Sequence, residues 1–229
     1  MNVTYIHHSA FLVETRSASL LFDWFEGQLP PIPKEKPLYV LSSHSHHDHF
    51  TENIFTLEHP NITYLLSWDI PEACVPEKWR GKTYFLGPYE TWQDGSLSLE
   101  TFRSTDQGVA FWCSLDGKEI YHAGDLNHWY WEGEDEQWNA DMTAAYRAEV
   151  AKMAGRTADI AFLPVDPRLD AWFYLGADDF MNQADTRYLL PMHFWGDFSV
   201  CNKLIEHPCS ENYRSKILTI QKKGQLFSL

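Results

Sequence analysis

The chain has 229 residues, a length that suits one large domain over residues 1–229. Hydrophobic residues make up 44% of it and aromatic residues 15%, so it can bury a substantial core, which excludes a disordered protein. A net charge of -14 repels phosphate backbones and anionic lipids, so we expect a small-molecule substrate and neither nucleic acid nor a membrane as partner.

The N-terminal sequence MNVTYIHHSA has neither the basic start nor the long apolar run of a signal peptide. No stretch reaches the roughly 18 apolar residues that a membrane span needs. Four scattered cysteines without a CxxC pair are expected to be buried and reduced. We therefore expect a cytoplasmic protein, whose oligomeric state, a homo-oligomer included, the sequence leaves open.

Short segments rich in β-branched and aromatic residues dominate the chain up to residue 121. They predict strands at Val3–Ile6, Ala10–Glu14, Ser19–Phe22, Leu38–Ser42, Ile62–Leu66, Thr83–Leu86, Leu97–Phe102, Val109–Ser114 and Glu119–Tyr121. Four prolines between Leu29 and Pro37 predict a surface loop, and Asp116-Gly117 predicts a hairpin turn.

After residue 133 the hydrophobic period changes to three and four residues, which predicts an amphipathic helix from Glu134 to Gly155. Strands and helices then alternate: strand Ile160–Val165, helix Asp178–Arg187, strand Tyr188–Met192, helix Val200–Glu206 and strand Lys216–Ile220. Early strands and late strand–helix units predict two sheets packed face to face with helices outside, a layered α/β sandwich.

The residues that carry chemistry begin where strand Leu38–Ser42 ends, with the run His44-Ser-His46-His47-Asp48-His49. On an extended chain, alternate residues share a face, so His44, His46 and Asp48 are expected to point one way and His47 the other. A turn after Asp48 brings His49 back. Three imidazoles and a carboxylate predict a metal site suited to zinc, manganese or iron.

This run resembles the HxHxDH motif of the metallo-β-lactamase superfamily. Further segments resemble that family in the same order: Ser9-Ala10-Phe11, Leu20 to Asp23, Tyr121 to Asp125, and Pro191-Met-His193. The likeness runs from about His8 to His193 and is strongest to the branch that includes ascorbate 6-phosphate lactonase. It implies a four-layer αββα sandwich and a hydrolase of a small ester-like substrate, such as a lactone or a phosphoester.

The resemblance also implies two divalent metal ions, zinc or manganese, with iron as a further candidate. His44 and His46 then hold one ion, Asp48, His49 and His193 hold the other, and Asp125 bridges them. Asp48 is also the expected catalytic group, which orients the attacking water and carries its proton. Asp23 accepts a hydrogen bond from a ligand imidazole, and His122 is expected to be buried beside the site rather than to bind metal.

One position departs from the family pattern. The family offers a further histidine to the first metal before the bridging aspartate, but this chain has none from position 60 to 121. Asp106 is the only strong ligand in that segment, and it is predicted to replace the histidine, with an ordinary turn residue as the alternative. An aspartate makes the site richer in oxygen and moves its preference from zinc toward manganese or iron.

Other residues near these segments are candidates for binding the substrate. His128, Trp129, Trp131 and Trp195 could line a cleft or simply anchor the long helix. Arg168 could clamp a phosphate or carboxylate, or form an ion pair with Asp166 or Asp170. Either His7 or His8 could approach the site, since neighbours on a strand point to opposite faces.

Two other functions remain possible on sequence grounds. One is a nuclease or phosphodiesterase of the same fold, which the acidic charge opposes. The other is a metal-binding sensor or di-iron redox protein; relatives of that kind usually work with a flavin domain, for which the sequence has no segment.

Overall fold

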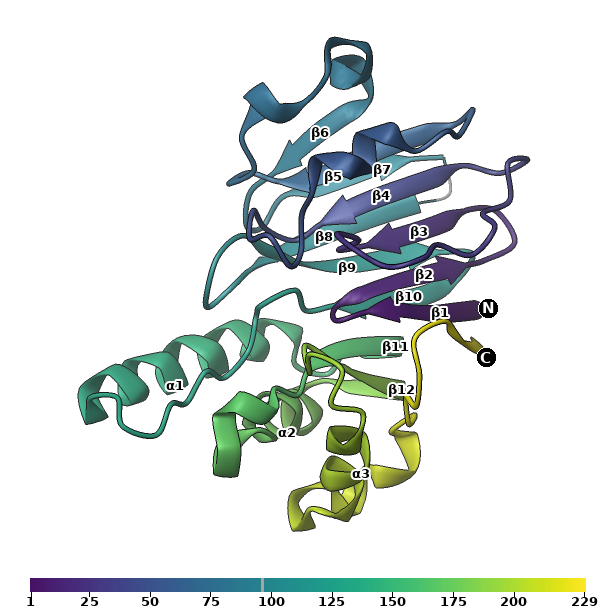
Figure 1. The fold of residues 1–229 in the computed structure, drawn as a ribbon. Helices are drawn as coiled ribbons and strands as arrows, with labels where there is room; N and C mark the ends of the chain where they lie inside the picture. The colour runs from purple at the N-terminus through teal and green to yellow at the C-terminus, as the bar shows by residue number, and fades with distance from the viewer. Residues whose placement is uncertain (96) are drawn as a thin grey trace.

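The computed structural model describes residues 1–95 and 97–229. Over these residues the strands form two sheets that lie face to face (Figure 1). The order of the first sheet is β13-β1-β2-β3-β4-β5-β6 and that of the second is β12-β11-β10-β9-β8-β7. The predicted α/β sandwich is confirmed.

The strands of the first sheet are β1 (Asn2–His7), β2 (Ala10–Glu14), β3 (Ser19–Phe22), β4 (Leu38–Ser42), β5 (Ile62–Ser67), β6 (Thr83–Leu86) and β13 (Gln225–Ser228). Those of the second are β7 (Thr91–Asp94), β8 (Leu97–Arg103), β9 (Val109–Leu115), β10 (Lys118–His122), β11 (Thr157–Pro164) and β12 (Asp185–Met192). The α-helices are α1 (Glu136–Val150), α2 (Leu175–Gln183) and α3 (Ser199–Glu206).

Alternation along the strands builds two separate apolar layers on the first sheet. Phe11 and Phe22 face the second sheet, and the Phe11 ring lies 4.3 Å from that of Phe162 on β11. Leu12 and Leu21 point to the opposite face. That face is covered by short 3-10 helices at Glu52–Thr56, Glu72–Cys74 and Glu77–Lys82 in place of long α-helices.

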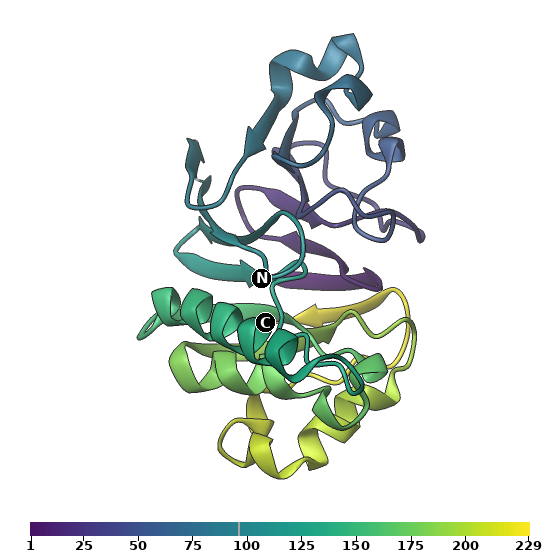
Figure 2. The ribbon, with the colours of Figure 1, turned by 90° about the vertical axis from the view of Figure 1, so that its left-hand side faces the viewer.

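The α-helices cover the outer face of the second sheet, on the side of β11 and β12 (Figure 2). Tyr121 of β10 stacks on Phe180 of α2, with ring centroids 4.9 Å apart, and the Tyr146 hydroxyl of α1 donates to the Gly176 carbonyl. The carboxylate of Asp135 caps α1 by accepting from the backbone N–H groups of Gln137 and Trp138.

Several predicted element boundaries are wrong. The predicted helix Asp178–Arg187 lies at Leu175–Gln183, because Asp185 already pairs with Thr157 as the start of β12. Residues Lys216–Ile220 form no strand and make only one isolated bridge, from Ile217 to Leu189. Strands β7 and β13 were not predicted, since their short exposed segments carry little hydrophobic pattern.

The loop from Leu29 to Pro37 has no regular structure, as predicted. All four cysteines are free; Cys113 and Cys201 are buried, whereas Cys74 and Cys209 are only half buried. Within residues 1–95 and 97–229, none of the helices has the length and apolar character needed to cross a bilayer.

Because neighbouring strands run parallel, the segments that carry the candidate site residues lie at the same edge of the sandwich. Strands β3, β4 and β5 run parallel to one another, as do β10, β11 and β12. The residues that follow the carboxyl ends of β3, β4, β10, β11 and β12 include Asp23, His44, Asp125, Asp166 and His193. This edge is where ligands bind in many parallel sheets.

Candidate metal centre

The histidine run leaves β4 and immediately turns. The backbone N–H groups of His49 and Phe50 both donate to the His46 carbonyl, at 3.0 and 2.9 Å. The extended geometry predicted for this run is therefore wrong. The turn sends His44 and His46 to one side of the site, and Asp48 and His49 to the other. The side chain of His47 is 89% exposed and is not among the possible metal ligands, although it lines the cavity beside the site.

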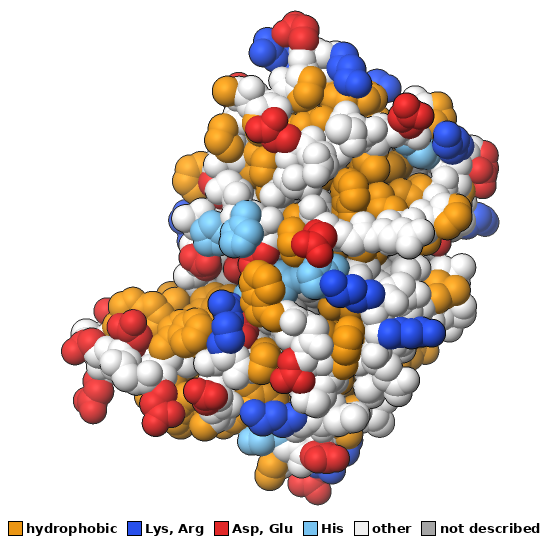
Figure 3. Space-filling view, viewed as in Figure 1, with side chains coloured by type: hydrophobic (Ala, Val, Ile, Leu, Met, Phe, Trp, Pro, Cys, Tyr) orange, Lys and Arg blue, Asp and Glu red, His pale blue; other side chains and the backbone are white. Residues whose placement is uncertain are grey.

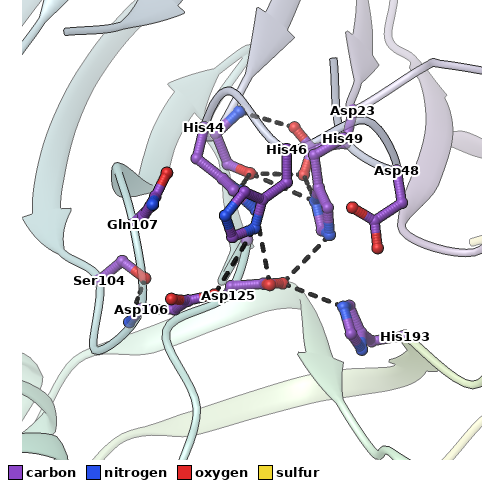
Figure 4. Close-up of polar contacts among 12 residues, drawn as sticks. Asp23, His44, His46, Asp48, His49, Ser104, Asp106, Gln107, Asp125 and His193 are labelled. Atoms are coloured by element: carbon purple, nitrogen blue, oxygen red, sulfur yellow. Dashed lines mark hydrogen bonds and ion pairs between the residues drawn. The ribbon is translucent and has the colours of Figure 1, made fainter. Parts of the chain in front are cut away.

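Asp125 lies at the centre of the site, just after β10 (Figure 4). Its Oδ2 is 3.5 Å from His44 Nε2, while its Oδ1 is 3.2 Å from His49 Nε2 and 3.3 Å from His193 Nε2. One carboxylate thus faces imidazoles on both sides. This placement agrees with the bridging position that the sequence predicts for Asp125.

The possible metal ligands fall into two clusters, in each of which one ligand atom per residue lies within 4.8 Å of all the others. The first cluster is His44, His46, Asp106 and Asp125; the second cluster is His8, Asp48, His49 and His193. Asp106 Oδ2 is 3.6 Å from His46 Nδ1, so the residue proposed to replace the missing histidine lies at the required place.

Buried polar atoms without partners show that cations fit these clusters. His49 Nε2, His193 Nε2 and Asp125 Oδ1 are buried and, among the described residues, make no hydrogen bond. The two imidazole nitrogens lie 3.2 and 3.3 Å from Asp125 Oδ1 without hydrogen-bond geometry, so a cation between them would give each of the three buried atoms a partner. All three point toward the same small space, and nitrogen and carboxylate oxygen are the ligands that borderline divalent metals prefer.

The protonation of the imidazoles also suits metal binding. Burial lowers the pKa of His44 and His49 to about 4, so both keep a free lone pair at neutral pH. Burial acts in the same direction on His193, but the carboxylates of Asp125 and Asp166 outweigh it and raise the pKa of His193 to about 10. A metal must therefore displace a proton from His193.

Carboxylates behind the imidazoles fix their orientation. Asp23 is fully buried and accepts from His49 Nδ1 and from the Ser43 N–H and hydroxyl, each at 2.7 Å. This is the contact predicted for Asp23. Asp166 accepts a hydrogen bond from His193 Nδ1 at 2.9 Å. This contact was not predicted from the sequence, although the position of Asp166 just after β11, where other site residues also follow strands, is a signal for it. Such contacts hold each imidazole in one tautomer.

His122 is buried beside the metal clusters without belonging to either. Its Nε2 faces the Ser9 carbonyl at 2.9 Å, its Nδ1 accepts from the Gly124 N–H, and its ring stacks on Phe22. His122 is expected from the sequence to be buried beside the site and not to bind metal. Both of its ring nitrogens are hydrogen-bonded to backbone atoms, so neither is free to bind a metal ion. His122 lies 3.9 Å from Asp23 and makes no hydrogen bond to a cluster imidazole.

A cavity of about 500 Å³ opens beside the clusters. From the two clusters it is lined by His46, Asp48, Asp106, Asp125 and His193. Its other lining residues are His47, Thr105, Trp129, Trp131, Trp138, Met142, Arg168 and Trp195. In Figure 3, histidine and acidic side chains reach the surface next to a hydrophobic area that extends over α1. The placement of Trp129, Trp131 and Trp195 agrees with the predicted cleft wall, whereas Trp138 and Met142 are additions from the structure.

The prediction for His128 is wrong. Its ring lies between α1 and α2, away from the cavity, with Nδ1 2.8 Å from Asp179 and Nε2 2.7 Å from Thr143. Both nitrogens are occupied, so the ring packs helices together instead of binding substrate. Arg168 lines the cavity and also forms the ion pair with Asp166 that was the alternative for it.

Comparison with known proteins identifies the family. Residues 2–193 match the family model described as "Beta-lactamase superfamily domain". The chain belongs to this superfamily. A UPF0173 metal-dependent hydrolase of Pyrobaculum calidifontis is 30% identical over 185 residues, which cover 73% of this chain and 81% of the relative. A second one, from Desulforamulus reducens, is 30% identical over 142 residues, or 55% of this chain and 62% of the relative.

Among solved structures, a metallo hydrolase of Ignicoccus hospitalis superposes with a TM-score of 0.64 at 18% identity, covering 100% of this chain and 98% of the other. This likeness shows the shared fold. The chain is thus a metal-dependent hydrolase of the β-lactamase superfamily. Its finer resemblance to ascorbate 6-phosphate lactonase remains a prediction.

Proposed function

We propose that this superfamily member hydrolyses a small ester-like molecule, a lactone or a phosphoester, that carries one carboxylate or phosphate and an apolar part. The observation that carries the proposal is the joint placement of two histidine–carboxylate clusters and a tryptophan-lined cavity. The clusters supply a place for the reacting ester, and the cavity supplies a binding site for the rest of the molecule.

We assign one divalent ion to each cluster, with Asp125 facing both. Two carboxylates in the first cluster favour manganese or iron over zinc at that position. When bound, a pair of such ions lowers the pKa of a water molecule and polarises the carbonyl or phosphoryl oxygen. The protein contributes the positions of the ligands and the surroundings of the ester.

Asp48 is the residue that we assign to orient the attacking water. It lines the cavity and is only 8% exposed. Burial by itself raises the pKa of Asp48, but the neighbouring imidazoles of His8 and His49 outweigh this and lower it below its usual range. The carboxylate therefore stays ionised and can accept a hydrogen bond from water, whose proton it passes to the leaving group.

The walls of the cavity favour a substrate with an apolar part. Trp129 and Trp131 lie parallel, with ring centroids 6.3 Å apart. Trp129 and the 44% exposed Trp195 both lie near the His193 ring, at centroid distances of 5.3 and 6.4 Å. Flat aromatic surfaces bind apolar groups and exclude water from the ester. The acidic charge of the chain repels RNA, which favours a small molecule over a nucleic-acid polymer.

Arg168 supplies an arginine side chain to the lining of this cavity. Its guanidinium lies 5.8 Å from the Trp131 ring and 5.9 Å from the Trp195 ring, so it sits between two walls. Nε and Nη2 bind Asp166, and the side chain is still 50% exposed. The exposed edge of the guanidinium can bind a substrate carboxylate or phosphate.

The test is a hydrolysis screen with the metal-loaded protein on small lactones, phosphoesters and thioesters, with RNA as the contrasting substrate. We expect hydrolysis of small substrates and little cleavage of RNA. For an anionic substrate that is turned over, Arg168→Ala should raise KM about 10-fold or more, since a charge-assisted hydrogen bond contributes about 1.5–3 kcal/mol. KM for a neutral analogue should change little.

A different result would point to an indirect role of Arg168. Because Arg168 also binds Asp166, which holds His193, its loss could loosen the metal site. An equal fall in kcat for the anionic and neutral substrates would show that effect and contradict the anion clamp. Efficient cleavage of RNA would contradict the proposed substrate class.

A further inference from the structure

We infer that His8 is a metal ligand of the second cluster, beside Asp48, His49 and His193. The inference rests on the metal dependence in the proposed function and goes beyond the ligand set that the family motif implies. His8 comes from the first hairpin of the chain, far in sequence from the other ligands. The inference is carried by the position of the His8 ring, by the absence of a hydrogen bond at either ring nitrogen among the described residues, and by the approach of Nε2 to the Asp48 carboxylate.

The backbone holds His8 in an unfavourable conformation that aims its ring at the cluster. His8 occupies the turn between β1 and β2 with φ of +54°, a left-handed value that costs a residue other than glycine about 1–2 kcal/mol. Its N–H donates to the Tyr5 hydroxyl at 3.0 Å, and its carbonyl accepts from the His193 N–H at 3.4 Å. Strain of this kind is concentrated at functional sites.

The imidazole of His8 is fully buried among the residues of the second cluster. Its Nε2 lies 3.5 Å from Asp48 Oδ2, and its ring centroid is 4.1 Å from that of His193 and 5.5 Å from that of His49. Neither ring nitrogen makes a hydrogen bond among the described residues. Nε2 is at ion-pair distance from Asp48 but outside hydrogen-bond geometry, and a cation shared with Asp48, His49 and His193 would give this buried nitrogen a direct partner.

The adjacent histidine shows that this placement is specific. His7 lies on the same hairpin but points away, with its Nε2 3.9 Å from the exposed Glu26. It does not belong to either cluster. His7 is therefore a matched control, because its replacement removes the same side chain from the neighbouring position.

The experiment titrates Mn²⁺ or Co²⁺ into chelator-treated protein and its variants, without measuring turnover. His8→Gly is the main variant, since glycine accepts the positive φ and leaves the hairpin unstrained. We expect the binding step of the second cluster to lose at least about 10–100-fold in affinity, the range seen when a residue that supports a metal ligand is removed. Co²⁺ absorption should lose intensity or shift, and added imidazole should restore part of the affinity.

His7→Ala should bind metal as the natural protein does. His8→Asn, which also tolerates positive φ, serves as a second variant, with circular dichroism to confirm folding. Affinities and Co²⁺ spectra of both His8 variants equal to those of the natural protein would overturn the assignment, while leaving the hydrolase proposal intact. Failure of the natural protein to bind either ion would overturn both.

Discussion

Replacing Asp125 with alanine is expected to lower kcat/KM by more than about 100-fold, the upper end of the loss seen for residues that only support a metal ligand. Asp125 faces His44 on one side and His49 and His193 on the other, at 3.2 to 3.5 Å. Its loss removes the shared carboxylate and leaves neighbouring cations to repel each other. Metal analysis after gel filtration should show fewer ions per chain than in the natural protein.

Asp106→Asn is the matched comparison for this variant. Asp106 belongs to the first cluster alone, so its neutral replacement should weaken one site and leave close to one tightly held ion per chain. Two tightly held ions in Asp106→Asn would show that another residue fills this position. Wild-type metal content and turnover in Asp125→Ala would contradict the geometry of the whole site.

Gly108→Ala is expected to lower the free energy of unfolding by about 2–5 kcal/mol, combining the costs of a left-handed alanine and of overpacking. Gly108 lies in the turn between β8 and β9 with φ of +72°. An added Cβ would lie 2.0 Å from the Ser43 carbonyl oxygen and 2.6 Å from His44 Cβ, so the backbone that carries His44 must move. Metal affinity at the first cluster should fall as well.

Gly117→Ala separates the two costs. Gly117 has the same φ of +72°, but an added Cβ would meet nothing within 4 Å. It should therefore show only the conformational cost, about 1–2 kcal/mol, with metal binding unchanged. Denaturant unfolding of both variants in the metal-free state measures the difference. Equal losses in the two variants would refute the close contact at Ser43.

The local pattern of the sequence predicts most strands and the residues at their ends. Short runs rich in β-branched and aromatic residues place β1 to β5 within a residue of their observed bounds, because strands buried on both faces read as nearly continuous apolar runs. The polar residues just after β4, β10 and β12 stand out against these apolar runs. The dense histidine run from His44 could be found for that reason, whereas Asp125 and His193 were assigned through the resemblance to the family.

Features that depend on distant contacts could not be predicted in this way. Strand β13 forms only because its backbone pairs with β1, more than two hundred residues away, and its own side chains are half exposed. His128 looked like a site residue because it is close in sequence to Asp125, but α1 and α2 enclose it. The approach of His8 to His193 likewise follows from tertiary packing of the first hairpin.

The central claim is that hydrolysis depends on two metal ions, one in each cluster. The most direct measurement is elemental analysis of protein purified without chelators, combined with turnover of a small lactone or phosphoester before and after metal removal. We expect two ions per chain, manganese, iron or zinc, with turnover lost on chelation and restored in step with the second equivalent added back. Full turnover in protein shown to contain no metal would contradict the claim.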